Sequence, residues 1–316
     1  MIHGSQHRPL ALHGGALVVL FLLQFILPAY HHTNFTSIMV LATYGIGYNI
    51  LIGYTGLLSL GHAMFFAAGL YAAGLGVHYL GLDPVSAFLF GAAVAMAFAT
   101  AVGLIALRTT GVSFMIVTMM FSQACYLLIL YFNDVTRGDE GIVLNEAARQ
   151  IAGLSLVEPA VRYNLALALF AGALILCLVL IRSRIGRVLI AIRENEERVE
   201  MLGYHTFRYK LLALALSGLL SGAAGAAYAL MFGYIGASFA SIEYSIYALL
   251  WVLLGGSGTV LGPLIGALLM FYLVEWTSEV TESYRIVVGA ALVLLTLFFP
   301  KGILGTLREK RLRWLP

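Results

Sequence analysis

Residues 45–56 read Gly-Ile-Gly-Tyr-Asn-Ile-Leu-Ile-Gly-Tyr-Thr-Gly, and they close an apolar run that begins near residue 35. The same pattern, G-x-x-Y-x-x-x-x-G-Y-x-G, returns at residues 225–236 as GAAYALMFGYIG. Because glycine tolerates a positive φ, each G-Y-x-G is expected to end a helix and turn the chain tightly. Because two apolar runs end with the same pattern, the sequence indicates an internal repeat.

The composition around these segments is typical of a membrane protein. Of 316 residues, 61% are hydrophobic and 10% are charged, and the mean hydropathy is +0.94. Soluble proteins carry about 25% charged residues, and β-barrel strands would dilute the hydrophobicity with polar lumen residues. Since a spanning helix needs ~20 apolar residues, we expect an all-α polytopic membrane protein with about ten transmembrane helices. The expected spans lie near residues 10–31, 35–53, 56–80, 85–107, 111–132, 163–182, 211–232, 243–256, 262–276 and 285–300.

The distribution of charge predicts the orientation of a single membrane domain, residues 1–316. Basic residues concentrate in 183–210 and 301–316, whereas 133–162 carries several acidic residues. Loops rich in lysine and arginine stay cytoplasmic. We therefore expect 183–210 to be a cytoplasmic coupling loop, 301–316 a cytoplasmic tail and 133–162 an outer loop, with both termini in the cytoplasm.

With ten spans, the run that ends in residues 45–56 crosses inwards and the run that ends in residues 225–236 crosses outwards. The match then predicts a 5+5 inverted repeat, with halves near 10–132 and 163–300, as many transporters show. A chance match remains the alternative, because glycine and tyrosine are abundant in this chain. The expected helix breaks are Gly53, Gly56, Gly61, Gly233, Gly236, Gly255 and Gly258.

Uncharged polar and aromatic residues in and beside the spans are candidates for a translocation path. Tyr54 and Tyr234 could equally be aromatics at the headgroup level. His62 could contact substrate or gate the inner end, or it could be a buried histidine bonded to a backbone carbonyl. The candidate path residues are Tyr48, Asn49, Tyr54, Ser59, His62, Tyr228 and Tyr234.

The sequence predicts no catalytic residue and no metal site. It lacks a G-x-x-x-x-G-K-[ST] phosphate loop, and its two cysteines lie in apolar runs without CxxC spacing. Energy for active transport is therefore expected from another subunit. Residues 185–203 show apolar positions at helical spacing, which predicts an amphipathic helix ended by Gly203. That helix could dock in a groove of the partner or lie on lipid headgroups.

Three motifs together resemble those of bacterial ABC-transporter permeases of the branched-chain amino acid type, the LivM/LivH group. Residues 53–65, Gly-Tyr-Thr-Gly-Leu-Leu-Ser-Leu-Gly-His-Ala-Met-Phe, resemble the family signature. Residues 186–196 resemble its coupling loop, although the EAA-type sequence is only partly kept, and 255–263 resemble a third motif. The resemblance runs from about residue 35 to Gly302, and the chain's length and long outer loop are more similar to the LivM type than to the LivH type.

The resemblance implies the permease subunit of an ATP-driven importer with a type II-like architecture in the bacterial inner membrane. Such a subunit moves branched-chain or related hydrophobic amino acids from periplasm to cytoplasm by alternating access. Members of the family also serve urea, short amides and aromatic acids, so the substrate stays open. A secondary transporter and a passive channel remain as alternatives.

The implied partners are a homologous LivH-type permease, two cytoplasmic ABC ATPase subunits, a periplasmic substrate-binding protein and membrane lipid, with no nucleic acid. ATP and Mg²⁺ would be bound by the ATPase, and no cofactor is expected on this chain. The resemblance places the coupling helix at about 191–202. The implied coupling residues are Ala191, Arg193, Glu194, Asn195, Glu196, Glu197, Arg198, Leu202 and Gly203.

Overall fold

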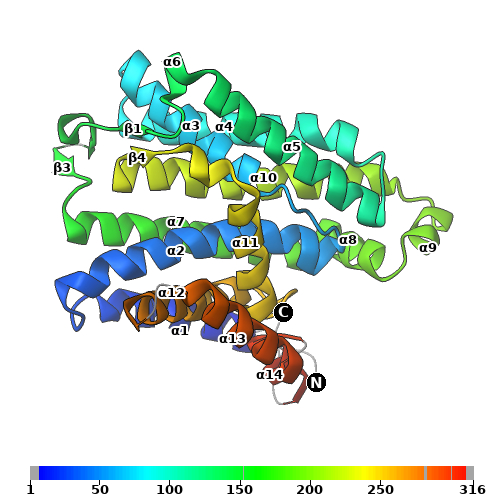
Figure 1. Cartoon of the computed structure of the whole chain (residues 1–316). Coiled ribbons are helices and arrows are strands. Elements are labelled where there is room, and N and C mark those ends of the chain that lie inside the picture. The colour runs from blue at the N-terminus through cyan, green and yellow to red at the C-terminus, as the bar shows by residue number, and fades with distance from the viewer. Residues whose placement is uncertain (1–6, 152, 281–282, 300, 311–316) are drawn as a thin grey trace.

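The structure, a computed structural model, is built almost wholly of helices that run side by side (Figure 1). It describes residues 7–310 except 152, 281–282 and 300. Residues 1–6 of the expected domain, and 311–316 of the expected tail, lie outside the described residues. The longer helices are α1 (His7–Leu23), α2 (Ala29–Asn49), α3 (Ala63–Leu80), α4 (Pro84–Ala106), α5 (Gly111–Tyr131), α7 (Pro159–Arg182), α10 (Thr206–Phe232), α11 (Ile242–Gly255), α12 (Gly262–Val280) and α13 (Tyr284–Phe298).

Short elements connect these helices. Strand β1 pairs antiparallel with β4, and β2 pairs with β3. The short elements are the π-helical turn η1 (Ile50–Thr55), α6 (Asn133–Thr136), β1 (Ile142–Val143), η2 (Glu146–Ala148), β2 (Gln150–Ile151), β3 (Leu154–Ser155), α8 (Arg184–Glu194), α9 (Glu196–Met201), β4 (Tyr234–Ile235), η3 (Ala237–Ala240) and α14 (Ile303–Lys310).

The expected all-helical, multi-span membrane fold is confirmed. Within the described residues, seven helices are long and apolar enough to cross a membrane: Tyr30–Thr55, Ala63–Leu80, Pro84–Ala106, Gly111–Tyr131, Pro159–Arg182, Thr206–Phe232 and Gly262–Val280. The other three expected spans coincide with the shorter helices α1, α11 and α13. A total of ten crossings therefore stays a prediction.

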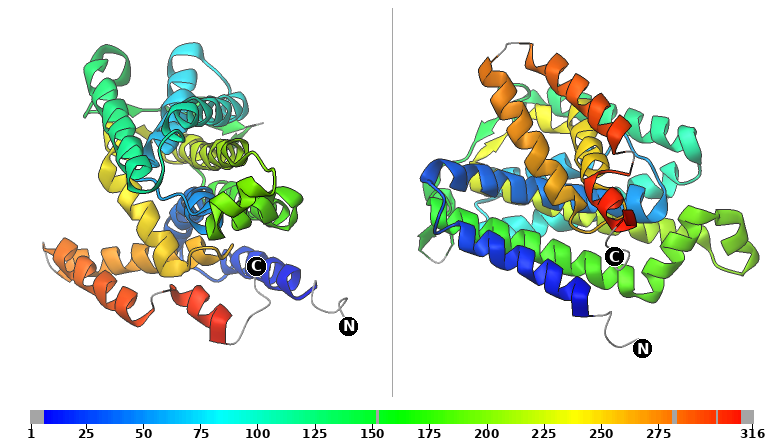
Figure 2. Two further views of the ribbon diagram at one scale, coloured as in Figure 1. Left: turned by 90° about the vertical axis from the view of Figure 1, so that its right-hand side faces the viewer. Right: turned by 90° about the horizontal axis from the view of Figure 1, so that it is seen from below.

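Helix α11 runs obliquely across the other helices (Figures 1 and 2). Its 14 residues span about 21 Å, which is less than the ~30 Å of a bilayer's hydrocarbon core. The helix starts where the Ser241 hydroxyl accepts a bond from the backbone of Tyr244, and it ends at Gly256, where φ is 118°. These two local signals keep α11 shorter than the hydrocarbon core, so a crossing at this place would need the residues beside the helix as well.

Four expected boundaries are wrong. The spans expected to start at residues 35 and 56 begin at Ala29 and Ala63. The first span was expected to reach residue 31, but α1 ends at Leu23 and α2 begins at Ala29. Pro28 lies between them at the N-cap of α2, where its missing N–H is harmless. Helix α10 begins at Thr206 rather than near 211, because the charge of Lys210 is paired and can be buried within the helix.

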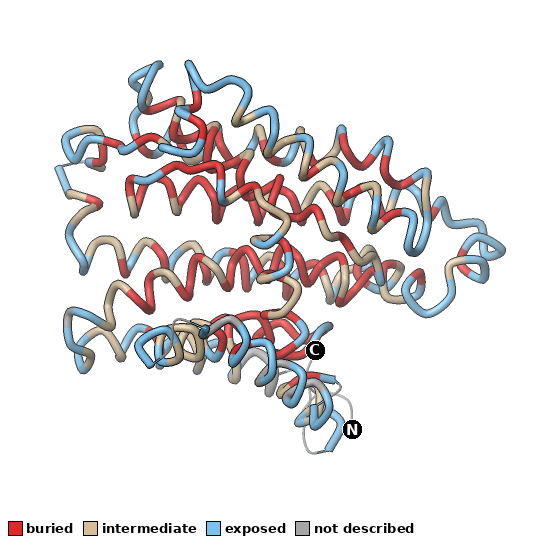
Figure 3. The backbone as a smooth tube through the Cα atoms, in the orientation of Figure 1, coloured by how far each residue is buried: buried red, intermediate tan, exposed pale blue. Residues whose placement is uncertain are grey.

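The interior is packed through glycine and other small residues. Figure 3 shows the buried residues gathered along the central helices. Helix α10 packs against α2, α3 and α4, and a Cβ on Gly69 of α3 would lie under 3.0 Å from the backbone of Gly222 in α10. Gly218 likewise faces Ala99 of α4. Because lipid is as apolar as the side chains, close packing of this kind holds membrane helices together.

A second small-residue contact joins α11 to α12. Cβ atoms on Gly255 and Gly266 would meet the backbones of Gly262 and Trp251, respectively. The Gly-x-x-x-Gly pairs at 218–222 and at 262–266 therefore both lie at close helix contacts.

The two G-Y-x-G segments end their helices at different glycines. Gly56, with φ 76°, ends the first, after the π-helical turn that contains Gly53. In the second segment Gly233, with φ 71°, ends α10, and Gly236 is extended. Figure 1 shows α2 running toward the end of the molecule that carries α8 and α9, and α10 running away from it. The opposite directions agree with an inverted repeat, which stays a prediction.

The remaining expected breaks also lie at helix ends. Gly61 lies in the irregular segment before α3, Gly255 is the last residue of α11, and Gly258 has φ 73° in the loop that follows. Each of these three glycines either adopts a positive φ or approaches another backbone too closely for a side chain.

Replacing Gly69 with alanine is expected to lower the melting temperature of the protein in detergent. The new Cβ would overlap the Gly222 carbonyl, and overpacking costs about 1–3 kcal/mol or more. The matched control is Gly172→Ala in α7, where no atom lies within 4 Å of the added Cβ. Equal melting temperatures for the two variants would contradict the packing argument.

Candidate functional site

A buried polar cluster surrounds His62 at the start of α3. Its Nε2 lies 2.8 Å from the Ser221 hydroxyl and 3.1 Å from the Ser217 hydroxyl, both on α10. Its ring stacks on Tyr44, at 5.8 Å and 20°, and meets the edge of Tyr48 at 4.8 Å. The Nδ1 atom has no hydrogen-bond partner among the described residues. His62 is thus held by serine hydroxyls rather than by the expected backbone carbonyl.

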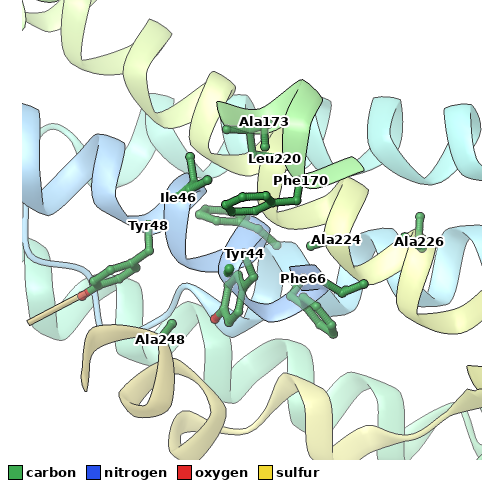
Figure 4. Packing of buried hydrophobic residues seen from close by; sticks show 14 of the residues in the cluster. Tyr44, Ile46, Tyr48, Phe66, Phe170, Ala173, Leu220, Ala224, Ala226 and Ala248 are labelled. Atoms are coloured by element: carbon green, nitrogen blue, oxygen red, sulfur yellow. The ribbon is translucent and has the colours of Figure 1, made fainter. Parts of the chain in front are cut away.

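Tyr48 of α2 holds the irregular segment between η1 and α3 against the core, and Ser217 joins α10 to α2. The Tyr48 hydroxyl donates to the Ser59 carbonyl at 2.7 Å, and the Ser217 hydroxyl donates to the Gly47 carbonyl at 2.5 Å. Figure 4 shows Tyr44 and Tyr48 projecting from α2 into this packed region. Tyr48, Ser59 and His62 are fully buried, so here they form part of the interior rather than an open pathway.

Asn49 joins the break of α2 to the loop after α11. Its Oδ1 accepts a hydrogen bond from the Gly258 N–H at 2.9 Å, and its Nδ2 donates to the Thr259 carbonyl at 3.0 Å. A Cβ on Gly53 would collide with both the Asn49 amide and the Gly258 backbone. We call this meeting point of residues 49, 53, 258 and 259 the break junction.

Arg193, near the end of α8, also contacts the break junction. Its Nη1 donates to the Gly53 carbonyl at 2.5 Å, and its Nη2 lies 2.7 Å from a Glu194 oxygen. From α14, Arg308 donates to the Gly258 carbonyl at 3.1 Å. Two separate short helices, α8 and α14, therefore bind carbonyls at the two helix breaks.

The single amphipathic helix expected over residues 185–203 is wrong, and so is the continuous coupling helix at 191–202. The structure has two helices, α8 and α9, and between them Asn195 is extended at φ −164° and ψ 101°. The Asn195 side chain accepts a bond from the backbone of Arg198 at 2.9 Å, an N-cap contact that asparagine favours. Gly203, with φ 86°, follows the end of α9.

The α8–α9 segment is anchored to α10 but exposes its tip. Lys210 is buried and pairs with Glu196 at 2.5 Å, and the Thr206 hydroxyl donates to Glu200 at 2.6 Å. At the tip, Met201 and Leu202 are 83% and 72% exposed. Of the implied coupling residues, Glu196 is half-buried and those exposed are Ala191, Arg193, Glu194, Asn195, Glu197, Arg198, Leu202 and Gly203.

The remaining candidate path residues do not join the His62 cluster. Tyr54 lies buried in η1, with no hydrogen-bond partner for its hydroxyl among the described residues. Tyr228 packs on Phe232 and Phe239. Tyr234 is exposed in β4, where it pairs with Val143 of β1. Burial favours a packing role for Tyr54, whereas the position of Tyr234 fits an interfacial aromatic.

Several residues at these contacts were not identified from the sequence. Ser217 and Ser221 carry no local motif, and their partner His62 lies more than 150 positions away in the chain. The pairing of Lys210 with Glu196 joins two separate helices, α10 and α9. The capping role of Asn195 could have been found, because asparagine followed by two glutamates is typical of a helix start. In the part of the chain that the structure describes, no three His, Cys, Asp or Glu side chains group as a metal ion would require.

Comparisons with known proteins agree with these features. The chain is 29% identical to the high-affinity branched-chain amino acid transport system permease LivM of Escherichia coli, over 87% of this chain and 70% of that protein. It is 24% identical to BraD of Pseudomonas aeruginosa, over 84% and 91%. It is 31% identical to the ribose import permease RbsC of Haemophilus influenzae, over 39% and 40%. No solved structure matches.

The family model described as branched-chain amino acid transport system, permease component, matches residues 32–297. That range includes the His62 cluster, the break junction and the α8–α9 segment. The chain therefore belongs to this family of multi-pass membrane permeases, and it is the transport subunit of an ABC system rather than an enzyme.

Proposed function

We propose that this permease works by alternating access, and that movement of a partner ATPase reaches the membrane through α8, α9 and the break junction. The observation that supports this is the bond from Arg193 to the Gly53 carbonyl. It links the end of the cytoplasmic segment directly to the interrupted helix of the membrane domain. If the hydrogen bonds at a helix break can be exchanged for others, the break has two discrete arrangements. Energetic coupling between two distant sites requires an element of this kind.

The exposed tip of α9 is the proposed docking surface for the ATPase, with the ATP and Mg²⁺ bound by that partner. Exposed apolar side chains mark interaction sites, and Met201 and Leu202 lie here beside the charged residues Glu197 and Arg198. The ion pair between Glu196 and Lys210 would transmit a push on α9 to α10. The full importer would hold two ATPase subunits, a homologous LivH-type permease and a periplasmic binding protein that docks on the outer loop.

The proposed cargo is a branched-chain or related hydrophobic amino acid, carried from periplasm to cytoplasm. Support comes from the LivM and BraD relatives, whose names state branched-chain amino acid transport, and from the family description. We further propose ten crossings with a 5+5 inverted repeat of type II-like architecture. Both termini would be cytoplasmic. The last turn of α1 contacts the start of α7, so α1 begins on the side to which α7 runs, and Arg308 of α14 contacts the break junction that Arg193 of α8 also contacts.

Replacing both Met201 and Leu202 with glutamate is expected to abolish co-purification of the ATPase while the permease still folds. Both side chains are exposed, so the change removes an apolar docking surface without disturbing the core. The control is Val143→Glu, an equally exposed apolar residue in the outer loop. Full recovery of ATPase with the double variant would refute the docking surface.

Replacing Arg193 with methionine is expected to leave the complex assembled but to reduce ATP-dependent uptake in proteoliposomes by at least about tenfold. A hydrogen bond to a charged group is worth about 1.5–3 kcal/mol, and here it would favour one of the two states. Arg182→Met, at the exposed cytoplasmic end of α7, is the control. Unchanged uptake with R193M would contradict the proposed coupling through Arg193. Uptake that survives ATP depletion in the wild type would instead favour a secondary transporter.

The proposed orientation is tested with reporter fusions. A fluorescent protein fused after Pro316 should be fluorescent, because this end is expected to be cytoplasmic. Alkaline phosphatase inserted after Gly153, a position with no neighbour within 4 Å of a Cβ, should be active outside. An active phosphatase fused after Pro316 would invert the topology.

A further inference from the structure

A cavity of about 380 Å³ opens between α2, α11 and α12. Small-molecule sites are typically about 300–1,000 Å³, so this volume can hold a metabolite. Three aromatic residues of α11 line it: Tyr244, Tyr247 and Trp251. Met270 and Val274 of α12 add an apolar surface, and Glu275 contributes a carboxylate.

The Glu275 carboxylate has hydrogen bonds but no compensating cation. One of its oxygens, Oε1, accepts bonds from the Tyr30 hydroxyl and from the Asn34 amide, the latter at 3.1 Å. Across the described ranges, no lysine, arginine or histidine nitrogen forms an ion pair with it within 4.0 Å. Burying an unpaired charge is costly, so a half-buried carboxylate of this kind favours a ligand that brings a positive charge.

The aromatic side of the cavity is held in place by its neighbours. Tyr244 stacks on Tyr44 at 5.7 Å and 12°, and it meets the edge of Trp251 at 6.5 Å. Aromatic rings attract cations, most strongly where water is excluded. Through Tyr44 the same rings continue to His62, so the cavity borders the buried aromatic core of the permease.

We infer that this cavity is a transport subsite for an amino acid, with Glu275 binding the α-ammonium group and the apolar lining holding the side chain. The inference rests on the proposed function, because it takes the cargo of the permease to be an amino acid. It assigns a chemical selectivity: a ligand with an ammonium group binds, whereas urea, amides and carboxylic acids without one do not.

The binding test uses the complete transporter in detergent, without the periplasmic binding protein, and measures the melting temperature. L-Leucine and 3-methylbutylamine, which share an ammonium group and an apolar chain, should raise it, whereas 4-methylpentanoate should not. A ligand that binds only the folded state stabilises it by mass action. Stabilisation by 4-methylpentanoate equal to that by L-leucine would overturn the inference.

The decisive variant is Glu275→Gln, with Glu279→Gln as its matched control. Glu279 lies one helical turn further along α12, is exposed and does not line the cavity. E275Q should weaken L-leucine binding and slow leucine uptake by at least about tenfold, or about 1.4 kcal/mol, whereas E279Q should bind and take up leucine as the wild type does. Equal uptake and binding by the two variants would overturn the subsite.

A second variant keeps the test valid if E275Q does not fold. Val274→Phe fills the cavity and should reduce leucine uptake more than alanine uptake, whereas an equal loss for both would count against the subsite. A lipid ammonium as the true occupant would show as an E275Q defect that disappears in vesicles without phosphatidylethanolamine, which would overturn the inference. A wild-type complex that takes up no leucine would contradict the proposed function itself.

Discussion

Asn49 joins two interrupted helices in a region where lipid offers no hydrogen bonds. Its side-chain amide accepts from the Gly258 N–H and donates to the carbonyl of the following residue. Unsatisfied backbone groups in a bilayer cost several kcal/mol each, so a broken helix persists only where neighbouring groups satisfy it. Gly53 leaves room for this contact, and Arg193 binds the carbonyl that Gly53 frees. The arrangement of η1, α8 and the loop after α11 depends on these bonds.

The interior has a closely packed part and a second part that is held by hydrogen bonds between side chains and backbone. Gly69 and Gly222 bring α3 and α10 into backbone contact, and such packing resists change because any shift opens a void. The break junction instead consists of hydrogen bonds from side chains of separate elements, which can be exchanged for others. In the proposed mechanism, a displacement of α9 would therefore change the hydrogen bonds of the break junction, whereas α3, α4 and α10 would move together as one rigid body.

Much of the site could be predicted from local patterns, and the exceptions have physical causes. The positive φ of Gly56 and Gly233 was predicted, because a glycine at the end of an apolar run commonly ends a helix in the left-handed conformation. The split between α8 and α9 was missed, since the apolar periodicity continues on both sides of Asn195 and conceals the cap. His62 was identified as a candidate, but its serine partners were not, because they lie on α10, more than 150 positions later in the chain.

The sequence by itself determined the membrane class, the position of most helices and the residues at which they break. Hydropathy, helical spacing and the conformational freedom of glycine are local properties, so they can be recognised without a fold. Only the tertiary structure decided the pairings: Arg193 with a carbonyl 140 residues away, Lys210 buried against Glu196, and Glu275 beside an aromatic cavity of α11. Each of these pairings depends on which helices pack side by side. That arrangement follows from many small-residue contacts acting together rather than from any one segment.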